Sequence, residues 1–282
     1  MNFQAWRPDM TYRWEKSVKK DDPGARGSHI YPVLDINNDG IDEFLYGERC
    51  IEFDTGKELF CADKDTWNGH SDMISPFQDP ATGRWVFWVI RETNPSQGPR
   101  IILYNDKGEH IWSAVDYGHI HKGWVGRIGE NGELIAVAES IETQTKTLQA
   151  RIYTGITEYA FDAFTGKPVN LPFSVSDTAP IDLDGDGLHE IVKGMSMGNS
   201  CVFDRKGNLI KEIGGRLSMC SKIASHPGEQ LLTHYPDGMV RIWADANAQD
   251  SPAAIKRYAH SFYHANRRFP TKESVMCILG GI

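Results

Sequence analysis

The feature that most constrains the fold of this 282-residue chain is an internal repeat. Residues 35–47 and 182–194 share the pattern D-x-[ND]-x-D-G-[IL]-x-E, followed by two apolar residues, one variable residue and glycine. Each copy leads to an apolar strand that ends in Phe-Asp, at Phe53-Asp54 and at Phe203-Asp204. Repeats of this kind are typical of proteins built from similar β-sheet units placed side by side.

A glycine turn marks the units more widely than the acidic motif does. Gly56, Gly108, Gly166 and Gly207 each precede a strand, and glycine at that position supplies the positive φ that a tight hairpin requires. The intervening β-rich runs (85–90, 101–104, 134–138 and 230–233) alternate poorly between apolar and polar residues, as expected for strands covered on both faces. No segment shows a convincing helical periodicity. The sequence therefore predicts an all-β fold.

We interpret the units as blades of a β-propeller that occupies residues 1–282 as one domain. A two-sheet sandwich is the alternative, but it would not repeat one strand–turn–strand unit at blade length. Five blades can close a ring; we favour a seven- or eight-bladed ring that has lost its first blades, because the first 28 residues look like the tail of an earlier unit. The predicted blades are 29–62, 70–114, 119–170, 173–213 and 218–257, and 258–282 form a closing tail.

Composition excludes several function classes. The formal charge is −8 and no block is rich in Lys or Arg, which argues against a nucleic-acid partner. No apolar run approaches the roughly 18 residues that a membrane span needs. The first residues, Met1 to Pro8, do not read as a signal peptide. The 40% hydrophobic fraction is ordinary for a globular protein.

The five cysteines match no zinc motif in their spacing. A hairpin that turns at residues 54–56 would bring Cys50 near Cys61. These two could form a cross-strand disulfide in an oxidising compartment, or they could be two half-buried thiols. We favour the thiols.

The acidic repeats resemble the first half of a calcium-binding loop. Carboxylates at alternate positions, a glycine at the sharp turn and a later glutamate offer the hard oxygens that Ca²⁺ prefers. The alternative is an Asx turn at a blade corner without an ion. The sequence predicts structural Ca²⁺ at each loop, and the predicted ligands are Asp35, Asn37, Asp39 and Glu43 in the first loop and Asp182, Asp184, Asp186 and Glu190 in the second.

Two segments, 67–74 and 116–127, are rich in reactive side chains and open the first strand of a predicted blade. Such positions on neighbouring blades converge near the axis of a propeller, so His70 could face the same pocket as His119 and His121. The latter two point the same way in a strand and could chelate a metal, but proton transfer is the better use of them. Tyr117 could complete an acid/base pair. A hydrogen-bonded turn residue is the ordinary alternative for each histidine.

The same segments supply candidate substrate contacts. Arg49, Arg127 and Arg151, together with Lys122, could hold an anionic sugar, although a single arginine more often belongs to a surface ion pair. Trp67 and Trp124 could stack on sugar rings where they are exposed, although such residues more often pack between blades.

The run 33–47, the apolar hairpin after it and the sequence Gly69-His70-Ser71-Asp72 resemble the propeller polysaccharide lyases that act on rhamnogalacturonan, ulvan and rhamnose–glucuronate linkages. The resemblance covers residues 29–213 best. It implies that a His and a Tyr move protons at the uronic acid C5 and at the leaving oxygen, while an Arg or a cation neutralises the carboxylate. It maps these roles onto His70 and, less directly, onto Tyr117, His119, His121 and Arg127. It also implies a secreted or periplasmic protein.

One departure from the family pattern keeps a second activity open. The ulvan and rhamnose–glucuronate lyases carry another histidine shortly before the GHSD-type histidine, whereas residues 47–50 here read Gly-Glu-Arg-Cys. Related propeller α-L-rhamnosidases are similar in fold and act on rhamnosyl-glucuronate ends. We therefore expect a lyase that cleaves an acidic polysaccharide by β-elimination, then a rhamnosidase, because no carboxylate pair stands out, and then a non-catalytic glycan-binding propeller.

Overall fold

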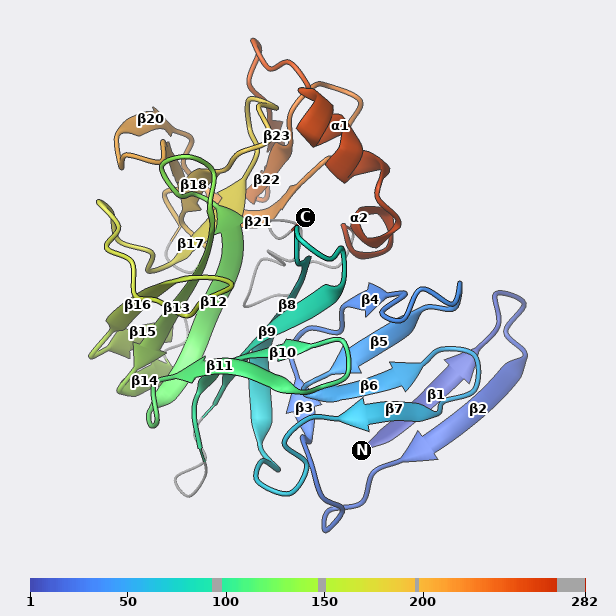
Figure 1. Cartoon of the computed structure of the whole chain (residues 1–282). Helices are drawn as coiled ribbons and strands as arrows, with labels where there is room; N and C mark the ends of the chain where they lie inside the picture. Colours follow the sequence, from blue (N-terminus) through green and yellow to red (C-terminus); the bar gives the residue numbers. More distant parts are fainter. Residues whose placement is uncertain (93–97, 147–150, 196–197, 268–281) are drawn as a thin grey trace. The chain divides into compact units, whose positions relative to one another are not determined.

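The computed structural model describes residues 1–92, 98–146, 151–195, 198–267 and 282, with side chains left undescribed at 144–146 and 151–153. The chain divides into two compact units, Met1–Ile120 and His121–Ile282, which are described in turn. Figure 1 shows their strands and helices. The predicted all-β class is confirmed, because antiparallel strands make up most of the regular secondary structure in the described chain.

The first unit begins with a hairpin of β1 (Asn2–Trp6) and β2 (Tyr12–Ser17). A four-stranded antiparallel sheet follows, in the order β4 (Val33–Leu34), β5 (Glu43–Tyr46), β6 (Arg49–Glu52) and β7 (Glu58–Cys61). The first acidic repeat forms the loop between β4 and β5. The apolar hairpin predicted after the repeat is thus the pair β6–β7.

The second sheet of this unit has the order β11-β10-β9-β8-β3. Its strands are β3 (Gly27–Ser28), β8 (His70–Gln78), β9 (Trp85–Arg91), β10 (Ile101–Asn105) and β11 (His110–Ala114). All seven residues of β9 are buried, which explains why the run 85–90 does not alternate. The short β3 pairs in parallel with the start of β8 and places Gly27 opposite His70.

The second unit contains three further sheets and a hairpin. The sheets are β12 (His119–Arg127) with β13 (Leu134–Ile141) and β16 (Thr157–Asp162); β17 (Thr178–Ile181) with β18 (Glu190–Lys193), β19 (Cys201–Phe203) and β20 (Leu209–Glu212); and β21 (Arg216–Ser221) with β22 (Gln230–His234) and β23 (Val240–Trp243). The strand β12 starts two residues before the unit boundary. The hairpin joins β14 (Thr143–Lys146) to β15 (Arg151–Thr154).

Two short helices in the second unit correct the expectation that no helix occurs. The helix α1 (Pro252–Ala259) starts after the Ser251 cap, whose side chain accepts a hydrogen bond from the Ala254 N–H, and α2 (Ser261–Asn266) follows it. The signal was present in the sequence, since a serine followed by proline at the first helical position is a typical helix start. It was missed because these helices are only 8 and 6 residues long, too short to show a clear period.

Each of the five predicted segments corresponds to the antiparallel strands of one larger sheet, at 33–61, 70–114, 119–162, 178–212 and 216–243. The strand β3, which joins the second sheet in parallel, lies outside all five segments. Each unit has its own core. Trp88, Phe77 and Phe87 are fully buried in the first, and Trp124 packs with Ile181 and Val192 in the second. No helix in the described part of the chain is long and apolar enough to cross a membrane.

The cysteines support the thiol interpretation. Cys50 and Cys61 are free, because the register places Cys50 opposite Phe60 and Cys61 opposite Arg49. Burial raises the pKa of both thiols, that of Cys61 to about 11. Both side chains are therefore neutral and serve as packing groups.

Candidate functional site

A cluster of histidines and carboxylates lies in the first unit around the start of β8. One ligand atom from each of His29, His70, Asp72 and Glu92 lies within 4.8 Å of the others. His70 and Asp72 come from β8, His29 follows β3, and Glu92 follows β9. Since β3, β8 and β9 are neighbours in one sheet, strand pairing alone brings these residues together. We call these four residues the His70 cluster.

The distances within the cluster are too long for ordinary hydrogen bonds. Nε2 of His29 lies 3.4 Å from Oδ1 of Asp72, and Nε2 of His70 lies 3.6 Å from the same oxygen. The two imidazole rings meet edge to face, with centroids 4.6 Å apart. His119, at the start of β12, borders the cluster, because its Nε2 lies 3.7 Å from Oε1 of Glu92.

These separations fit a shared divalent cation. Imidazole nitrogen and carboxylate oxygen bind Zn²⁺ at about 2.0–2.2 Å, so two tetrahedral ligands of one ion stand about 3.3–3.6 Å apart. Asp72 is only 1% exposed, and Nε2 of His70 is buried without a hydrogen bond in the described structure. A buried nitrogen that faces a buried carboxylate oxygen at this distance is an arrangement that an ion would complete. The mixed donors suit Zn²⁺ or Mn²⁺ better than Ca²⁺, which takes oxygen only.

Burial favours the neutral form of two of these histidines, His70 and His119. Burial lowers the pKa of His70, and the neighbouring His29 and His119 lower it further, against the opposing effect of Glu92. Burial likewise lowers the pKa of His119, again opposed by Glu92. A neutral imidazole has a lone pair free to bind a metal or accept a proton.

A network of buried ion pairs and hydrogen bonds holds the start of β8 in place. Ser71, between the two cluster residues of the strand, donates to Oε2 of Glu48 at 2.8 Å, and Glu48 accepts from Nε of Arg91 at 2.7 Å. Arg91 also donates to Asp63 and to the Tyr104 hydroxyl. Glu48 is 0% and Arg91 1% exposed, so the Glu48–Arg91 pair is compensated in a dry environment, while Asp63 is partly exposed. The network fixes the backbone that carries His70 and Asp72.

Gly27 makes room for the His70 ring. A Cβ at this position would lie 2.4 Å from Nδ1 of His70, a distance at which the ring would have to move. The glycine is thus required by close packing across the β3–β8 pair. Gly27 and the network of Ser71, Glu48 and Arg91 together set the position of the His70 imidazole.

Some predicted site residues have other roles in the first unit. Arg49 is 4% exposed and donates to Glu58 and to the Pro23 and Ala25 carbonyls, so its guanidinium is engaged within the first unit. Trp67 is 1% exposed and lies beneath the Arg91 guanidinium, so its ring cannot stack on a sugar. Tyr117 is 82% exposed in solvent. His70 and His119, by contrast, lie near each other, since Glu92 acts on both.

The other predicted residues belong to the second unit. Lys122 is 6% exposed and its Nζ lies 3.0 Å from Oδ1 of Asp177, so it is a buried ion-pair partner. Trp124 is 2% and His121 7% exposed. Arg127 is half-buried, and burial together with the nearby Arg257 lowers its pKa. The backbone of Arg151 lies in β15, while its side chain is outside the described part of the structure.

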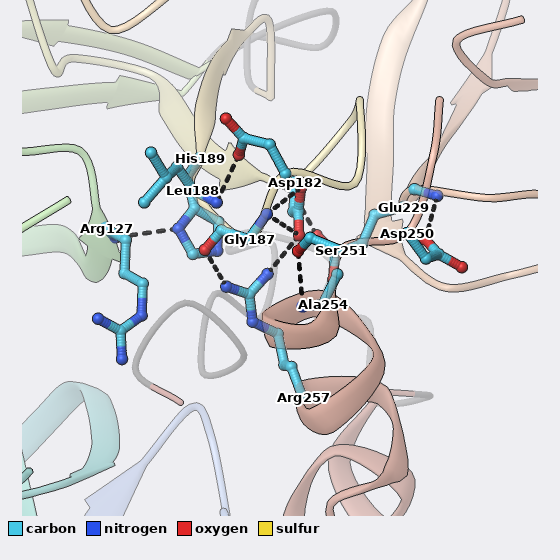
Figure 2. A network of polar contacts seen from close by, with 12 residues as sticks. Arg127, Asp182, Gly187, Leu188, His189, Glu229, Asp250, Ser251, Ala254 and Arg257 are labelled. Atoms are coloured by element: carbon cyan, nitrogen blue, oxygen red, sulfur yellow. Dashed lines mark hydrogen bonds and ion pairs between the residues drawn. The ribbon is translucent and has the colours of Figure 1, made fainter. Parts of the chain in front are cut away.

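The acidic loops share one backbone pattern. In the first, Glu43 accepts from the Ile36 N–H and Asp35 accepts from the Gly40 N–H. In the second, Glu190 accepts from the Leu183 N–H. Figure 2 shows Asp182 accepting from the Gly187 N–H of the same loop. The glutamates therefore close the loops by binding backbone N–H groups. Ca²⁺ at the first loop stays a prediction.

Sequence reasoning missed His29, Asp72 and Glu92 as members of the site. Asp72 was visible in the Gly-His-Ser-Asp motif, two residues from His70 and on the same face of a strand. His29 and Glu92 carry no local signal, because only the pairing of β8 with β3 and β9 brings them to His70.

Comparisons with known proteins give a fold and no close relative. No protein-family model matches the chain, and no curated protein matches it. Solved structures similar in fold include rhamnogalacturonan lyase PL11 from Bacillus licheniformis (TM-score 0.62, 19% identity, 87% of this chain and 41% of that chain). The exotype rhamnogalacturonan lyase YesX has a TM-score of 0.62 and 18% identity, and the match covers 87% of this chain and 42% of that chain. Rhamnogalacturonan lyase YesW has a TM-score of 0.59 and 16% identity, and the match covers 96% of this chain and 46% of that chain.

This chain thus spans less than half the length of the lyases to which its fold is similar. The Dos1 propeller is also similar, with a TM-score of 0.50 and 13% identity. The resemblance to propeller polysaccharide lyases predicted from the sequence is confirmed by these structural neighbours.

Proposed function

We propose that this chain is a β-propeller polysaccharide lyase that cleaves a rhamnose- and uronic-acid-containing glycan by β-elimination, with its reaction centre at the His70 cluster. The observation that carries the proposal is the convergence of two imidazoles and two carboxylates on a rigid, buried strand start. The likeness of the fold to rhamnogalacturonan lyases supports the choice of glycan. The five sheets are then blades of the propeller.

The chemistry demands two things of the site. The C5 proton of a uronic acid is weakly acidic, so the charge of the neighbouring carboxylate must be neutralised before a base can remove that proton. As the C5–H bond breaks, the C5 electron pair forms the C4–C5 double bond. The C4–O bond then breaks, and the leaving oxygen takes a proton. No water and no redox partner is consumed.

We propose that the four residues of the His70 cluster hold a divalent cation. When bound, the cation would supply the positive charge that neutralises the uronate. The chain's own groups do the rest: Asp72 places a buried carboxylate oxygen between the two imidazoles, and the network through Ser71 and Glu48 fixes the strand.

His119 is the proposed proton acceptor. It borders the cluster without belonging to its four residues, its side chain is 28% exposed, and Glu92 orients its ring from 3.7 Å. Tyr117, two residues earlier and open to solvent, is the proposed proton donor to the leaving oxygen. Arg49 and Lys122 are engaged in ion pairs with Glu58 and Asp177, so we assign them no role in proton transfer.

The same geometry ranks hydrolysis below elimination. Paired carboxylates in glycosidases stand about 5–9.5 Å apart with substrate or water between them. Here the ligand oxygens of Asp72 and Glu92 lie within 4.8 Å of each other, in a cluster that two imidazoles complete. Such an arrangement suits a cation better than an acid/base pair of carboxylic acids.

The test is a substrate panel read in two ways. The full chain is incubated with rhamnogalacturonan, ulvan and gum arabic after loading with Zn²⁺, Mn²⁺ or Ca²⁺ in separate samples. We expect ultraviolet absorbance from an unsaturated uronate, with at least one metal and one glycan. Release of free rhamnose without this absorbance would replace the lyase with a rhamnosidase, and binding without either product would leave a glycan-binding propeller.

The cation is tested independently of activity. Metal content of the purified chain, measured by mass spectrometry after dialysis against the metal, is expected to show an equivalent that His70→Ala and Asp72→Asn lose. His110→Ala, an exposed histidine on β11, is the matched control and should retain it. Equal metal content in all four proteins would remove the cation from the proposal.

A further inference from the structure

The second acidic loop contains a cation that belongs to the protein itself. Arg257, on helix α1, is 3% exposed and reaches the loop with both terminal nitrogens (Figure 2). Its Nη1 lies 2.8 Å from Oδ2 of Asp182, the first position of the predicted calcium loop. Its Nη2 donates to the Gly187 carbonyl at 2.7 Å. The guanidinium thus spans the loop from its first acidic position to its glycine.

The remaining loop contacts leave Asp182 fully engaged. Asp182 is 0% exposed and accepts from the Gly187 N–H as well as from Arg257. Asp184 accepts from the Asp186 N–H, and Asp186 accepts from the Leu188 N–H, while both carboxylates remain exposed. The buried carboxylate, which would be the central Ca²⁺ ligand, is therefore paired with an arginine.

The segment that carries Arg257 is docked on the loop along its length. The Gln249 N–H donates to the Asp184 carbonyl at 2.9 Å, and the Ser251 N–H donates to the Gly185 carbonyl at 2.8 Å. A Cβ on Gly187 would lie 2.8 Å from Cβ of Ala253, so the glycine allows α1 to lie against the loop. The position of Arg257 is thus fixed by backbone contacts and not only by its own charge.

The first loop provides an internal comparison. It has the same backbone pattern, with Glu43 and Asp35 accepting from Ile36 and Gly40. Asp35 is only partly buried, and within the described residues no arginine or lysine donates to it. The two loops therefore share their sequence motif and hydrogen bonds and differ in the arginine.

We propose that Arg257 replaces Ca²⁺ in the second loop, so that this loop binds no calcium while α1 is docked. Calcium requires six to eight oxygen ligands, and here the guanidinium takes both the buried carboxylate and the glycine carbonyl. A divalent ion beside the same carboxylate would also be repelled by the arginine. The calcium-type motif is thus a docking site for α1. Arg257 on that helix holds the loop in its conformation, as a bound ion would.

The experiment is calcium titration of the full chain by calorimetry. Because the first loop could also take Ca²⁺, the comparison is between variants. Asp184→Asn is expected to leave the number of bound Ca²⁺ ions as in the unchanged protein. Arg257→Met is expected to bind one ion more, and Arg257→Met with Asp184→Asn is expected to lose that ion again. Lys256→Met, exposed on the same helix, is the control and should change nothing.

Two results would overturn the inference. One is the loss of a bound Ca²⁺ in Asp184→Asn alone, since the loop would then hold calcium with Arg257 present. The other is a folded Arg257→Met protein that gains no ion. If Arg257→Met does not fold, the Asp184→Asn comparison still decides, because it needs only the unchanged helix. None of these readings depends on lyase activity, so failure of the proposed function would be seen separately.

Discussion

Nε2 of His70 and Oδ1 of Asp72, two residues apart on β8, stand 3.6 Å apart, and the same oxygen lies 3.4 Å from Nε2 of His29. This one buried carboxylate oxygen is therefore approached by two imidazoles at a separation longer than a hydrogen bond. The three side chains meet only because β3 and β8 pair, since His29 follows β3 whereas His70 and Asp72 lie on β8. The proposed cation site therefore depends on this strand pairing.

Replacing His119 should separate catalysis from cation binding. His119→Gln removes the proposed proton acceptor but none of the four cluster residues, so kcat should fall by about 10²–10⁴-fold while metal content is unchanged. Steady-state kinetics and metal analysis on the same preparation check this. A loss of metal would place His119 among the ligands, and unchanged kcat would exclude it as the base.

Adding one methyl group at Gly27 should displace the His70 ring. The new Cβ of Gly27→Ala would meet Nδ1 of His70, so the imidazole must turn or β3 must separate from β8. We expect weaker metal binding and lower activity in a folded protein, measured by metal titration and circular dichroism. Gly83→Ala, where a Cβ meets nothing within 4 Å, is the control for an added methyl group; because Gly83 has a positive φ and Gly27 does not, any backbone strain falls on the control. Equal metal affinity in Gly27→Ala and the unchanged protein would contradict the packing argument.

Removing Arg91 should destabilise the first unit strongly. Arg91→Met leaves Glu48, which is 0% exposed, as an uncompensated buried charge, and such a loss costs about 3–5 kcal/mol. Urea unfolding measures the change. Adding Glu48→Gln should recover part of it, because the orphaned charge is then gone. Arg84→Met, which breaks an exposed pair with Asp106, should have a much smaller effect.

Lower pH should destabilise the second unit through His189. The ring is buried and its Nδ1 accepts the Arg127 N–H at 2.9 Å, while burial and Arg257, Arg127 and Arg205 hold its pKa well below the usual range. The unfolded chain takes up a proton below about pH 6.5 and the folded chain does not. Stability contributed by this residue is therefore complete above that pH and falls by up to about 1.4 kcal/mol per unit below it.

The check compares urea unfolding between pH 5 and 8 for three proteins. His189→Gln should show a shallower loss of stability below pH 6.5 than the unchanged chain, whereas His264→Gln, exposed on α2, should show the same loss. Identical slopes for His189→Gln and the unchanged chain would mean that the ring is protonated in the folded state.

The all-β class was predictable because hairpins carry local signals. The repeated acidic motif and the glycine turns mark strand ends, whereas β3 joins the second sheet in parallel from outside every predicted segment. The division into blades stays a prediction. The helices were missed because they span only two turns or fewer, although Ser251 and Pro252 mark the start of the first.

The residues of the site that could be predicted are those with a local sequence signal. His70 has a motif around it, and His119 opens a recognisable strand. His29 and Glu92 reach the cluster only through the pairing of β3, β8 and β9, which no local pattern encodes. In the same way, Arg257 lies 75 residues from Asp182, so a motif that predicts calcium could not reveal the arginine that takes its place.

The most direct test of the central claim is the initial rate at which unsaturated uronate forms from the best glycan of the panel, measured for the unchanged chain and for His70→Ala with His110→Ala as control. We predict activity in the unchanged chain and in His110→Ala, and a loss of at least about 10²-fold in folded His70→Ala. Equal rates in all three proteins would place the reaction elsewhere, and no unsaturated product from any glycan with any metal would contradict the lyase itself.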